Sequence, residues 1–203
     1  MISQHPHSLE AQRVWLQLCQ GDSAALNQVA EWYYAALLNY GLKLERDREL
    51  VKDLLQELFL ELWTRRESLP QPEDIKAYLF AILRNKIYRS YRQQSGYSHE
   101  AYPESLGSEE LGVESLLIHQ ETQEEYHLRL TKALESLSPR QREIIFLHYY
   151  EGLSHDQIAE IMQLNHQSVY NLLSRSLKEL RNAWVVGGVL WVANALSFPF
   201  PEN

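Results

Sequence analysis

The stretch that decides the fold is Ser138–Trp184, SPRQREIIFLHYYEGLSHDQIAEIMQLNHQSVYNLLSRSLKELRNAW. Ser138 and Ser154 are each followed three residues later by Gln, and Ser138 is also followed by Pro at the first helical position. Both patterns are typical of a helix start, because the Ser and Gln side chains satisfy N–H groups that the first turn leaves unpaired. Only residues 163–165 separate a helix ending at Met162 from the next one. The stretch therefore predicts a helix-turn-helix.

The second helix of this motif, which follows the capping residue Asn165, has two chemically distinct faces. At a period of 3.6 residues, one stripe is expected to pack inward and consists of Val169, Leu172, Leu173, Ser176, Leu177 and Leu180. The opposite stripe is polar and consists of Gln167, Tyr170, Asn171, Ser174, Lys178 and Arg181, with Arg175 beside it. This pattern favours binding of duplex DNA in the major groove. A plain helical hairpin with a solvated outer face is the alternative.

Two upstream segments give this motif a context. They are Leu50–Trp63, LVKDLLQELFLELW, and Ala77–Arg92, AYLFAILRNKIYRSYR. In this order, and followed by the helix-turn-helix, they resemble the bacterial RNA polymerase sigma factors, in particular the small two-domain group of extracytoplasmic-function sigma factors. The resemblance covers about residues 9–92 and 126–184. It implies an all-α chain of two small helical domains that binds core RNA polymerase, directs it to promoter DNA, works in the bacterial cytoplasm and is controlled by an anti-sigma factor.

The first of these segments belongs to a helix expected from about Asp47 to Arg65. Its apolar stripe is predicted to be buried and consists of Val51, Leu54, Leu55, Leu58 and Leu62. The other side carries Asp53, Gln56, Glu57 and Glu61, which is by itself an ordinary solvated face. The resemblance implies that Asp53, Gln56 and Glu57 form the main contact with core polymerase, where complementary charge sets register and capture rate.

The second segment, together with the loop before it, is predicted to handle melted promoter DNA. The loop at residues 65–72 contains two prolines and Arg66. Such loops are variable connectors by default, but the resemblance implies that this one captures a base flipped out of the duplex. Along the helix that follows, four side chains share one face: Asn85, Tyr88, Arg89 and Arg92. An aromatic platform with guanidinium groups is typical of a surface that binds single-stranded DNA.

Charge and composition divide the chain. Its net charge is −8, and the Gly-, Pro- and Ser-containing segment 93–125 alone holds eight Glu and no Lys or Arg, so the remainder is neutral. We therefore predict an N-terminal sigma domain at 1–92, an acidic linker at 93–125, a C-terminal helix-turn-helix domain at 126–184 and an apolar tail at 185–203. Charge alone favours a solvated linker, whereas the resemblance places it in a basic polymerase channel.

Enzymatic and metal-binding functions find little support. Ser154, His155 and Asp156 carry the letters of a hydrolase triad, but consecutive helical residues point in different directions. With one cysteine, Cys19, and no paired His spacing, the chain predicts no disulfide, no zinc site, no catalytic residues, no cofactor and no small-molecule substrate. The lone Cys and the absence of a leader pattern indicate a reducing cytoplasm. The apolar run at 183–193 is too short to span a bilayer, and we expect it to extend a helix or to form a docking patch.

The chain departs from the family pattern in three places. Most members carry an acid where this chain has Arg89, and basic residues where it has Tyr170 and Leu172. Gln163 replaces the usual Gly of the turn, at a cost of about 1 kcal/mol if that residue is left-handed. Two other functions therefore stay open. One is a helix-turn-helix regulator that binds duplex DNA without acting as a sigma factor, and the other is a protein derived from a sigma factor that no longer starts transcription.

Overall fold

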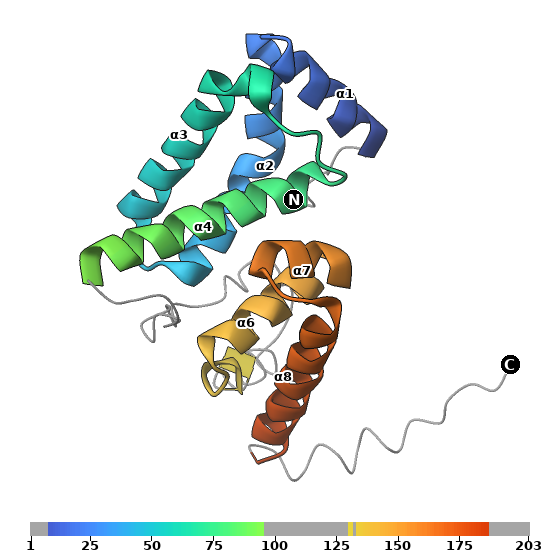
Figure 1. The fold of residues 1–203 in the computed structure, drawn as a ribbon. Coiled ribbons are helices and arrows are strands. Elements are labelled where there is room, and N and C mark those ends of the chain that lie inside the picture. The colour runs from blue at the N-terminus through green and yellow to red at the C-terminus, as the bar shows by residue number, and fades with distance from the viewer. Residues whose placement is uncertain (1–7, 96–129, 132, 187–203) are drawn as a thin grey trace, which may run out of the picture.

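The computed structural model describes residues 8–95, 130–131 and 133–186, and within these ranges every regular element is helical (Figure 1). The helices form two groups. The N-terminal unit holds α1 (Ser8–Cys19), α2 (Ser23–Leu44), α3 (Arg48–Thr64), a 3₁₀ turn η1 (Arg66–Ser68) and α4 (Ile75–Ser95). The C-terminal unit holds α6 (Pro139–Ile145), a π-helical turn η3 (Phe146–Tyr150), α7 (His155–Met162) and α8 (His166–Val186). The predicted all-α fold with a helix-turn-helix is confirmed.

Helix α3 forms where the sequence predicts it. The Asp47 side chain caps it by accepting hydrogen bonds from the N–H groups of Glu49 and Leu50, at 3.0 and 3.1 Å. Its predicted stripe is buried and consists of Val51, Leu54, Leu55, Leu58 and Leu62. Helix α4 runs to Ser95, a little past the expected end of the domain. Most of the acidic segment and the tail beyond Val186 lie outside the described residues, so the predicted domain limits stay a prediction.

The C-terminal unit has the predicted helix starts. Ser138 and Ser154 both form complete capping boxes with the Gln three residues later. The Asn165 side chain accepts a hydrogen bond of 2.8 Å from the N–H of Ser168 at the start of α8. Gln163 adopts the left-handed conformation, with φ 53° and ψ 49°, as expected for the residue in place of Gly.

The apolar stripe of α8 is largely as predicted. Val169, Leu173 and Ser176 are buried, and Leu172 is half-buried. The prediction is wrong for Leu177, whose side chain is exposed. At ~100° per residue Leu177 lies at the edge of the stripe, whereas Leu180, near its centre, is half-buried.

The π-helical turn η3 lies between α6 and the helix-turn-helix. Its ring closes with a hydrogen bond of 3.1 Å from the N–H of Glu151 to the carbonyl of Phe146, five residues back. Phe146 and Leu147 are buried, whereas Tyr149 and Tyr150 are exposed. The turn thus separates a buried half from an aromatic surface within one continuous helical run.

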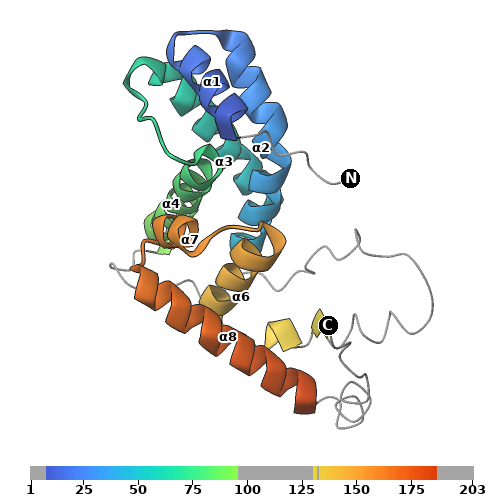
Figure 2. The same ribbon diagram turned by 90° about the vertical axis from the view of Figure 1, so that its right-hand side faces the viewer.

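The two units pack against each other across one continuous core. Tyr40 of α2 stacks on Phe80 of α4, with ring centroids 4.9 Å apart, and on Phe146 of the C-terminal unit at 6.1 Å. Both views show α7 lying against α4 (Figure 2). The sequence predicts two domains and a linker, but nothing in its periodicity predicts this contact. Among the described helices, none is long and apolar enough to cross a membrane.

The packing of α2 against α3 depends on Gly41 of α2. A Cβ atom at this position would lie 2.5 Å from the Cγ1 of Val51 on α3. Val51 is fully buried in the core. Gly at position 41 therefore allows α2 and α3 to pack this closely, because any other residue would place a Cβ atom against Val51.

We expect Gly41→Ala to lower the free energy of unfolding by about 1 kcal/mol, measured by urea denaturation. Overpacking should lower the free energy of unfolding by ~2 kcal/mol, and the better helix propensity of Ala should offset ~1 kcal/mol of that loss. The double variant Gly41→Ala/Val51→Ala is the test of cause, because it removes the clashing methyl group. It should be more stable than the sum of the two single changes. Strict additivity would contradict the steric explanation.

Candidate protein and nucleic-acid interfaces

The outer face of α3 is acidic and exposed. Asp53, Gln56 and Glu57 all lie on it, and no core residue covers them. Lys86 of α4 borders this face, with its Nζ 3.6 Å from a Glu57 carboxylate oxygen and 3.1 Å from one of Glu61. The hydrogen bond from Lys86 is the main cause that lowers the pKa of Glu61.

An exposed apolar side chain interrupts this acidic face. Leu60 is 66% exposed and lies one helical turn after Gln56 and Glu57. Nothing in the sequence distinguishes it from the buried leucines of α3 except its place off the apolar stripe. The face therefore offers a partner both charge and a hydrophobic contact.

The loop that follows α3 is held in place by its neighbours. Arg66 donates a hydrogen bond of 3.0 Å to the carbonyl of Trp63, and its guanidinium lies 4.8 Å from the centre of the Trp63 ring. Helix α1 ties the far part of the loop, because Trp15 donates to the carbonyl of Pro70 at 2.9 Å. The loop, which includes η1, is therefore an ordered surface rather than a free connector.

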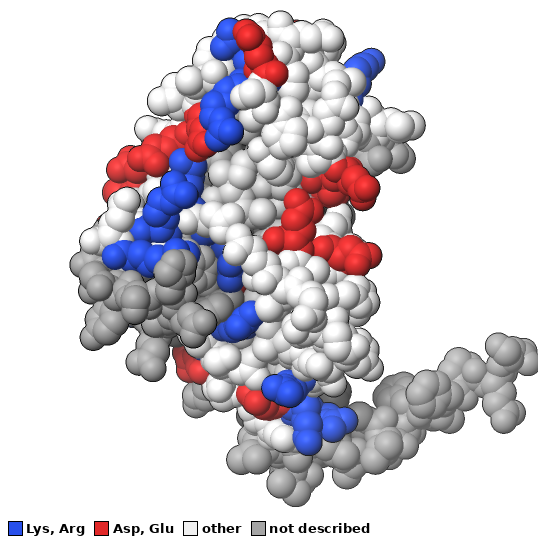
Figure 3. Space-filling model, viewed as in Figure 1, with Lys and Arg blue, Asp and Glu red and all other residues white. Residues whose placement is uncertain are grey.

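On α4, the four residues predicted to bind single-stranded DNA differ in their surroundings. Asn85, Arg89 and Arg92 are exposed, whereas Tyr88 is half-buried against the core. The guanidinium of Arg84 covers the Tyr88 ring at 4.4 Å. Figure 3 shows Lys and Arg side chains in a band over α3 and the C-terminal half of α4, with acidic side chains beside it. Lys and Arg side chains are thus available here to contact DNA, but the Tyr88 ring is covered by Arg84 and is not freely open for a base to stack on it.

On α8, the predicted polar stripe is exposed along its whole length. Its members are Gln167, Tyr170, Asn171, Ser174, Arg175, Lys178 and Arg181. The Gln167 amide donates a hydrogen bond of 3.1 Å to the side-chain carbonyl of Asn171, one turn later. Tyr170 is 57% exposed beside this amide pair. The stripe presents amides and an aromatic ring first and cations later, which is the order a recognition helix needs.

The contact between the two units contains charged residues that the sequence analysis did not select. The Arg84 guanidinium of α4 donates to the Glu143 carboxylate of α6, with Nε 2.8 Å from Oε1. Lys76 of α4 donates to the Glu151 carboxylate at 2.8 Å. Each of these residues stands beside at least one apolar residue, but three of the four also have charged neighbours within two positions, so the local sequence does not mark them as buried. The two partners of each ion pair are far apart in the sequence, so the sequence alone does not reveal the pairing.

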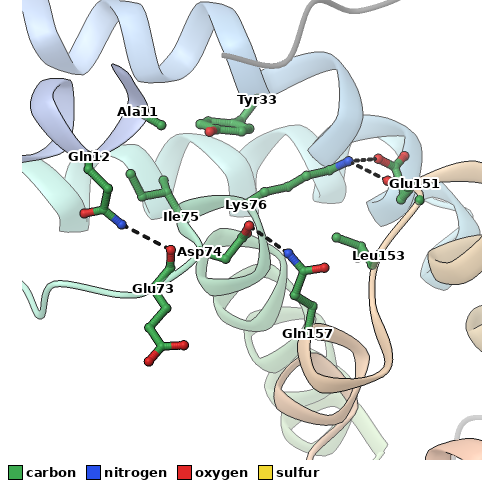
Figure 4. A pocket seen from close by; sticks show the side chains of 11 residues that line it. Ala11, Gln12, Tyr33, Glu73, Asp74, Ile75, Lys76, Glu151, Leu153 and Gln157 are labelled. Atoms are coloured by element: carbon green, nitrogen blue, oxygen red, sulfur yellow. Dashed lines mark hydrogen bonds and ion pairs between the residues drawn. The ribbon is translucent and has the colours of Figure 1, made fainter. Parts of the chain in front are cut away.

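A cleft of about 200 Å³ lies beside the Lys76–Glu151 pair, between the two units (Figure 4). Its walls are α1, α2, the segment that leads into α4, the segment before α7 and α7 itself, and its lining includes Gln12, Tyr33, Glu73, Asp74 and Gln157. In the part of the chain that the structure describes, no three His, Cys, Asp or Glu side chains are placed to hold a metal ion. Cys19 is half-buried, and burial raises the pKa of its thiol.

Two family models match the chain. Residues 29–97 match Sigma-70 region 2, and residues 127–180 match Sigma-70, region 4. The first match covers most of the N-terminal unit with its α3 and α4 faces, and the second covers the helix-turn-helix. Together they take in the α3 and α4 faces and all of the α8 stripe except Arg181.

Curated relatives and solved structures agree with these matches. The probable RNA polymerase sigma factor RfaY of Xanthomonas campestris is 29% identical over 70% of this chain, which spans only 36% of RfaY. The ECF RNA polymerase sigma factor SigL of Mycobacterium tuberculosis is 26% identical over 79% of the chain and 89% of SigL. Among structures, CnrH in complex with the cytosolic domain of CnrY has a TM-score of 0.57 at 19% identity, covering 85% of this chain and 95% of CnrH. RpoE of Bartonella quintana, in complex with the anti-sigma factor NepR, has a TM-score of 0.53 at 26% identity, covering 77% and 94%.

Proposed function

Since the chain belongs to the sigma-70 family, in its extracytoplasmic-function group, we propose that its three exposed faces divide the work of a sigma factor among them. The chain directs RNA polymerase to promoters rather than catalysing a reaction itself. The observation that carries the division is that α3, α4 and α8 each present a different chemistry to solvent. These are an acidic and apolar face, a cationic face with an amide, and an amide stripe followed by cations.

The face of α3 is the proposed contact with core polymerase. Asp53, Gln56 and Glu57 are exposed on one helix, and Leu60 adds an apolar contact next to them. Charged groups at an interface mainly set the capture rate and the register, whereas a buried apolar anchor supplies affinity. The two kinds of group on one face support a specific protein partner.

The faces of α4 and α8 are the proposed promoter contacts. Arg89 and Arg92 with Asn85 are suited to the backbone and bases of a melted strand, and Arg66 lies on the loop proposed to receive a flipped base. On α8, the amides of Gln167 and Asn171 are suited to base edges in duplex DNA, and Lys178 and Arg181 to phosphates. A sigma factor needs both kinds of contact.

An anti-sigma factor is a further proposed partner, and the bacterial cytoplasm the proposed location. The RpoE structure similar to this chain holds the anti-sigma factor NepR, which supports a partner of that kind here. This location is proposed because core RNA polymerase and promoter DNA are both in the bacterial cytoplasm. A helix-turn-helix regulator without polymerase binding is the weaker alternative, because it has no use for the α3 face or for a single-strand face on α4.

The α3 proposal predicts a loss of polymerase binding when its charge is reversed. Asp53→Lys/Glu57→Lys should weaken binding to core RNA polymerase about tenfold or more, measured by titration of labelled chain, because like charges then meet at the contact. The remaining affinity of this double variant for core polymerase should also depend less on salt concentration than the affinity of the unmodified chain does. Glu10→Lys/Glu31→Lys, at two exposed sites on α1 and α2, makes the same charge change away from the face. Equal affinity of both double variants would remove α3 from the contact.

The α4 proposal predicts a defect in promoter melting without a defect in polymerase binding. Asn85→Ala/Arg89→Ala/Arg92→Ala should reduce permanganate reactivity of unpaired thymines at a promoter, because the melted strand loses its cationic and amide contacts. Arg13→Ala/Arg48→Ala removes exposed cations elsewhere on the unit and should leave melting unchanged. Tyr88 stays intact in this test because its ring packs against the core. Normal melting by the triple variant would refute the proposal.

The α8 proposal predicts two kinds of promoter defect, measured by transcription of a promoter library. Gln167→Ala and Asn171→Ala should each cost about 1–3 kcal/mol at particular upstream base pairs. Their effects should not add, because the two amides hydrogen-bond each other. Lys178→Ala should weaken all promoters alike and reduce the salt slope by about one. If Gln167→Ala and Asn171→Ala lower transcription from every promoter by the same factor, α8 does not recognise the base sequence.

A further inference from the structure

Two side chains of α1 hold the backbone of the loop between α3 and α4. The Gln12 amide donates a hydrogen bond of 2.6 Å to the carbonyl of Pro72 and one of 3.2 Å to that of Glu73, and Figure 4 shows the second of these bonds. One turn later, the Trp15 indole N–H donates to the carbonyl of Pro70 at 2.9 Å. Three carbonyl groups of the loop are therefore bound by a helix that precedes α3 in the chain.

The loop needs donors from elsewhere because of its own sequence. Pro70 and Pro72 have no N–H group, so neither residue can donate a backbone hydrogen bond within a turn of the loop. The conformation of such a segment depends on what its carbonyl groups accept, since backbone polar groups that are shielded from water need partners. The hydrogen bonds from Gln12 and Trp15 therefore hold the path of this part of the loop.

The anchor on α1 is itself fixed by packing. The Trp15 side chain is fully buried, and its ring meets the Tyr78 ring of α4 edge to face, with centroids 5.6 Å apart. A hydrogen bond from a buried group is stronger than one in water, because its surroundings screen it less. The turn after α1 lies near the other end of the loop, since a Cβ atom at Gly21 would be 3.5 Å from Nε of Arg66. Helix α1 and the turn after it therefore adjoin the loop at both ends.

A fixed backbone matters for a loop that receives a flipped base. Such a base is recognised by hydrogen bonds to its Watson–Crick edge and by the shape of its pocket. These groups select one ligand only when their neighbours hold them within about 0.5 Å of the productive geometry. The wrong base then leaves polar groups of the pocket unpaired, whereas a loop that is free to shift adapts to any base. Residues that fix the loop therefore determine its selectivity without contacting the base.

We propose that Gln12 and Trp15 are positioning residues, which hold the loop at residues 65–74 in the conformation that selects the flipped promoter base. The inference rests on the proposed function, in that this loop is taken to receive the base. It gives α1 a part in promoter choice, although α1 lies outside both segments that match the family models. Helix α1 acts on the DNA only through the loop.

The test removes the two donors but keeps an unbranched chain and an aromatic ring in their places, as Gln12→Met/Trp15→Phe. In the free chain, hydrogen–deuterium exchange measured by mass spectrometry should become about tenfold faster in peptides from the loop. In transcription from promoters randomised over the melted region, the preference for one non-template base should fall about fivefold or more. Affinity for core polymerase should stay unchanged. Gln17→Met/Trp32→Phe makes the same two changes on the exposed face of α1 and on α2, where Trp32 packs on Tyr33, and should alter neither exchange nor preference.

Gln12→Met alone covers the case in which the double variant does not fold. Gln12 is half-buried, so this change removes two of the three hydrogen bonds without opening a cavity in the core. It should lower the base preference about two- to threefold. Exchange and base preference equal to those of the control variant would overturn the proposal. An equal loss of transcription at every promoter, with the preference intact, would overturn it as well, because that is the effect of a merely structural role.

Arg66→Ala tests the loop itself and separates this inference from the proposed function. Arg66 belongs to the loop, so its loss should reduce the same base preference while Gln12 and Trp15 stay in place. If Arg66→Ala leaves the preference unchanged, the loop does not select the base, and the function proposed for it is refuted. The exchange rates of Gln12→Met/Trp15→Phe still decide whether α1 positions the loop.

Discussion

The arrangement of this molecule depends on one buried carboxylate. Glu143 lies at the junction of α2, α4 and α6, and a charge at that depth is tolerated only if its oxygens receive hydrogen bonds and an opposite charge lies beside it. Tyr40 and Arg84 meet both needs, and they fix the position of α6 on the N-terminal unit to within hydrogen-bond distance. The stacked rings of Tyr40 and Phe146 fill the space around the pair. Apolar packing alone would allow many nearly equivalent positions of one helical unit on another, whereas a buried ion pair selects a single position.

Local signals in the sequence predict the local structure well. Capping side chains and a period of 3.6 residues place the start of α3, both capping boxes and the left-handed turn residue, because each signal acts within a few residues. The contact between the units could not be predicted in this way. Tyr40 and Glu143 are 103 residues apart, and the position of a charged residue in the sequence does not reveal its partner. Tyr88 shows the same limit: its place beside Asn85 and Arg89 indicates a binding face, but whether its ring is free depends on Arg84 and the core.

Exposure of the predicted site residues follows from helix periodicity, but their chemical setting does not. The α3 and α4 faces form one electrostatic surface, because Lys86 lies between the acids of α3 and the cations of α4 and contacts Glu57 and Glu61. A chain with net charge −8 can therefore bind DNA, since what a strand meets is the local field within about a Debye length rather than the total charge. The proposed polymerase-binding and DNA-binding faces thus share one ammonium group, that of Lys86.

The π-helical turn at Phe146–Tyr150 sets the direction in which the chain leaves α6. Each residue of an α-helix rotates the chain by ~100°, so the wider turn changes the direction in which the next segment leaves. Glu143 lies before the turn and Glu151 just after it, yet both face the same helix, α4. Both acids can therefore contact α4 only if the number of residues between Glu143 and Glu151 is fixed, just as the two residues themselves are. A single insertion or deletion there would keep every capping motif and every apolar stripe of the helix-turn-helix intact, but it would rotate that motif away from its seat on α4.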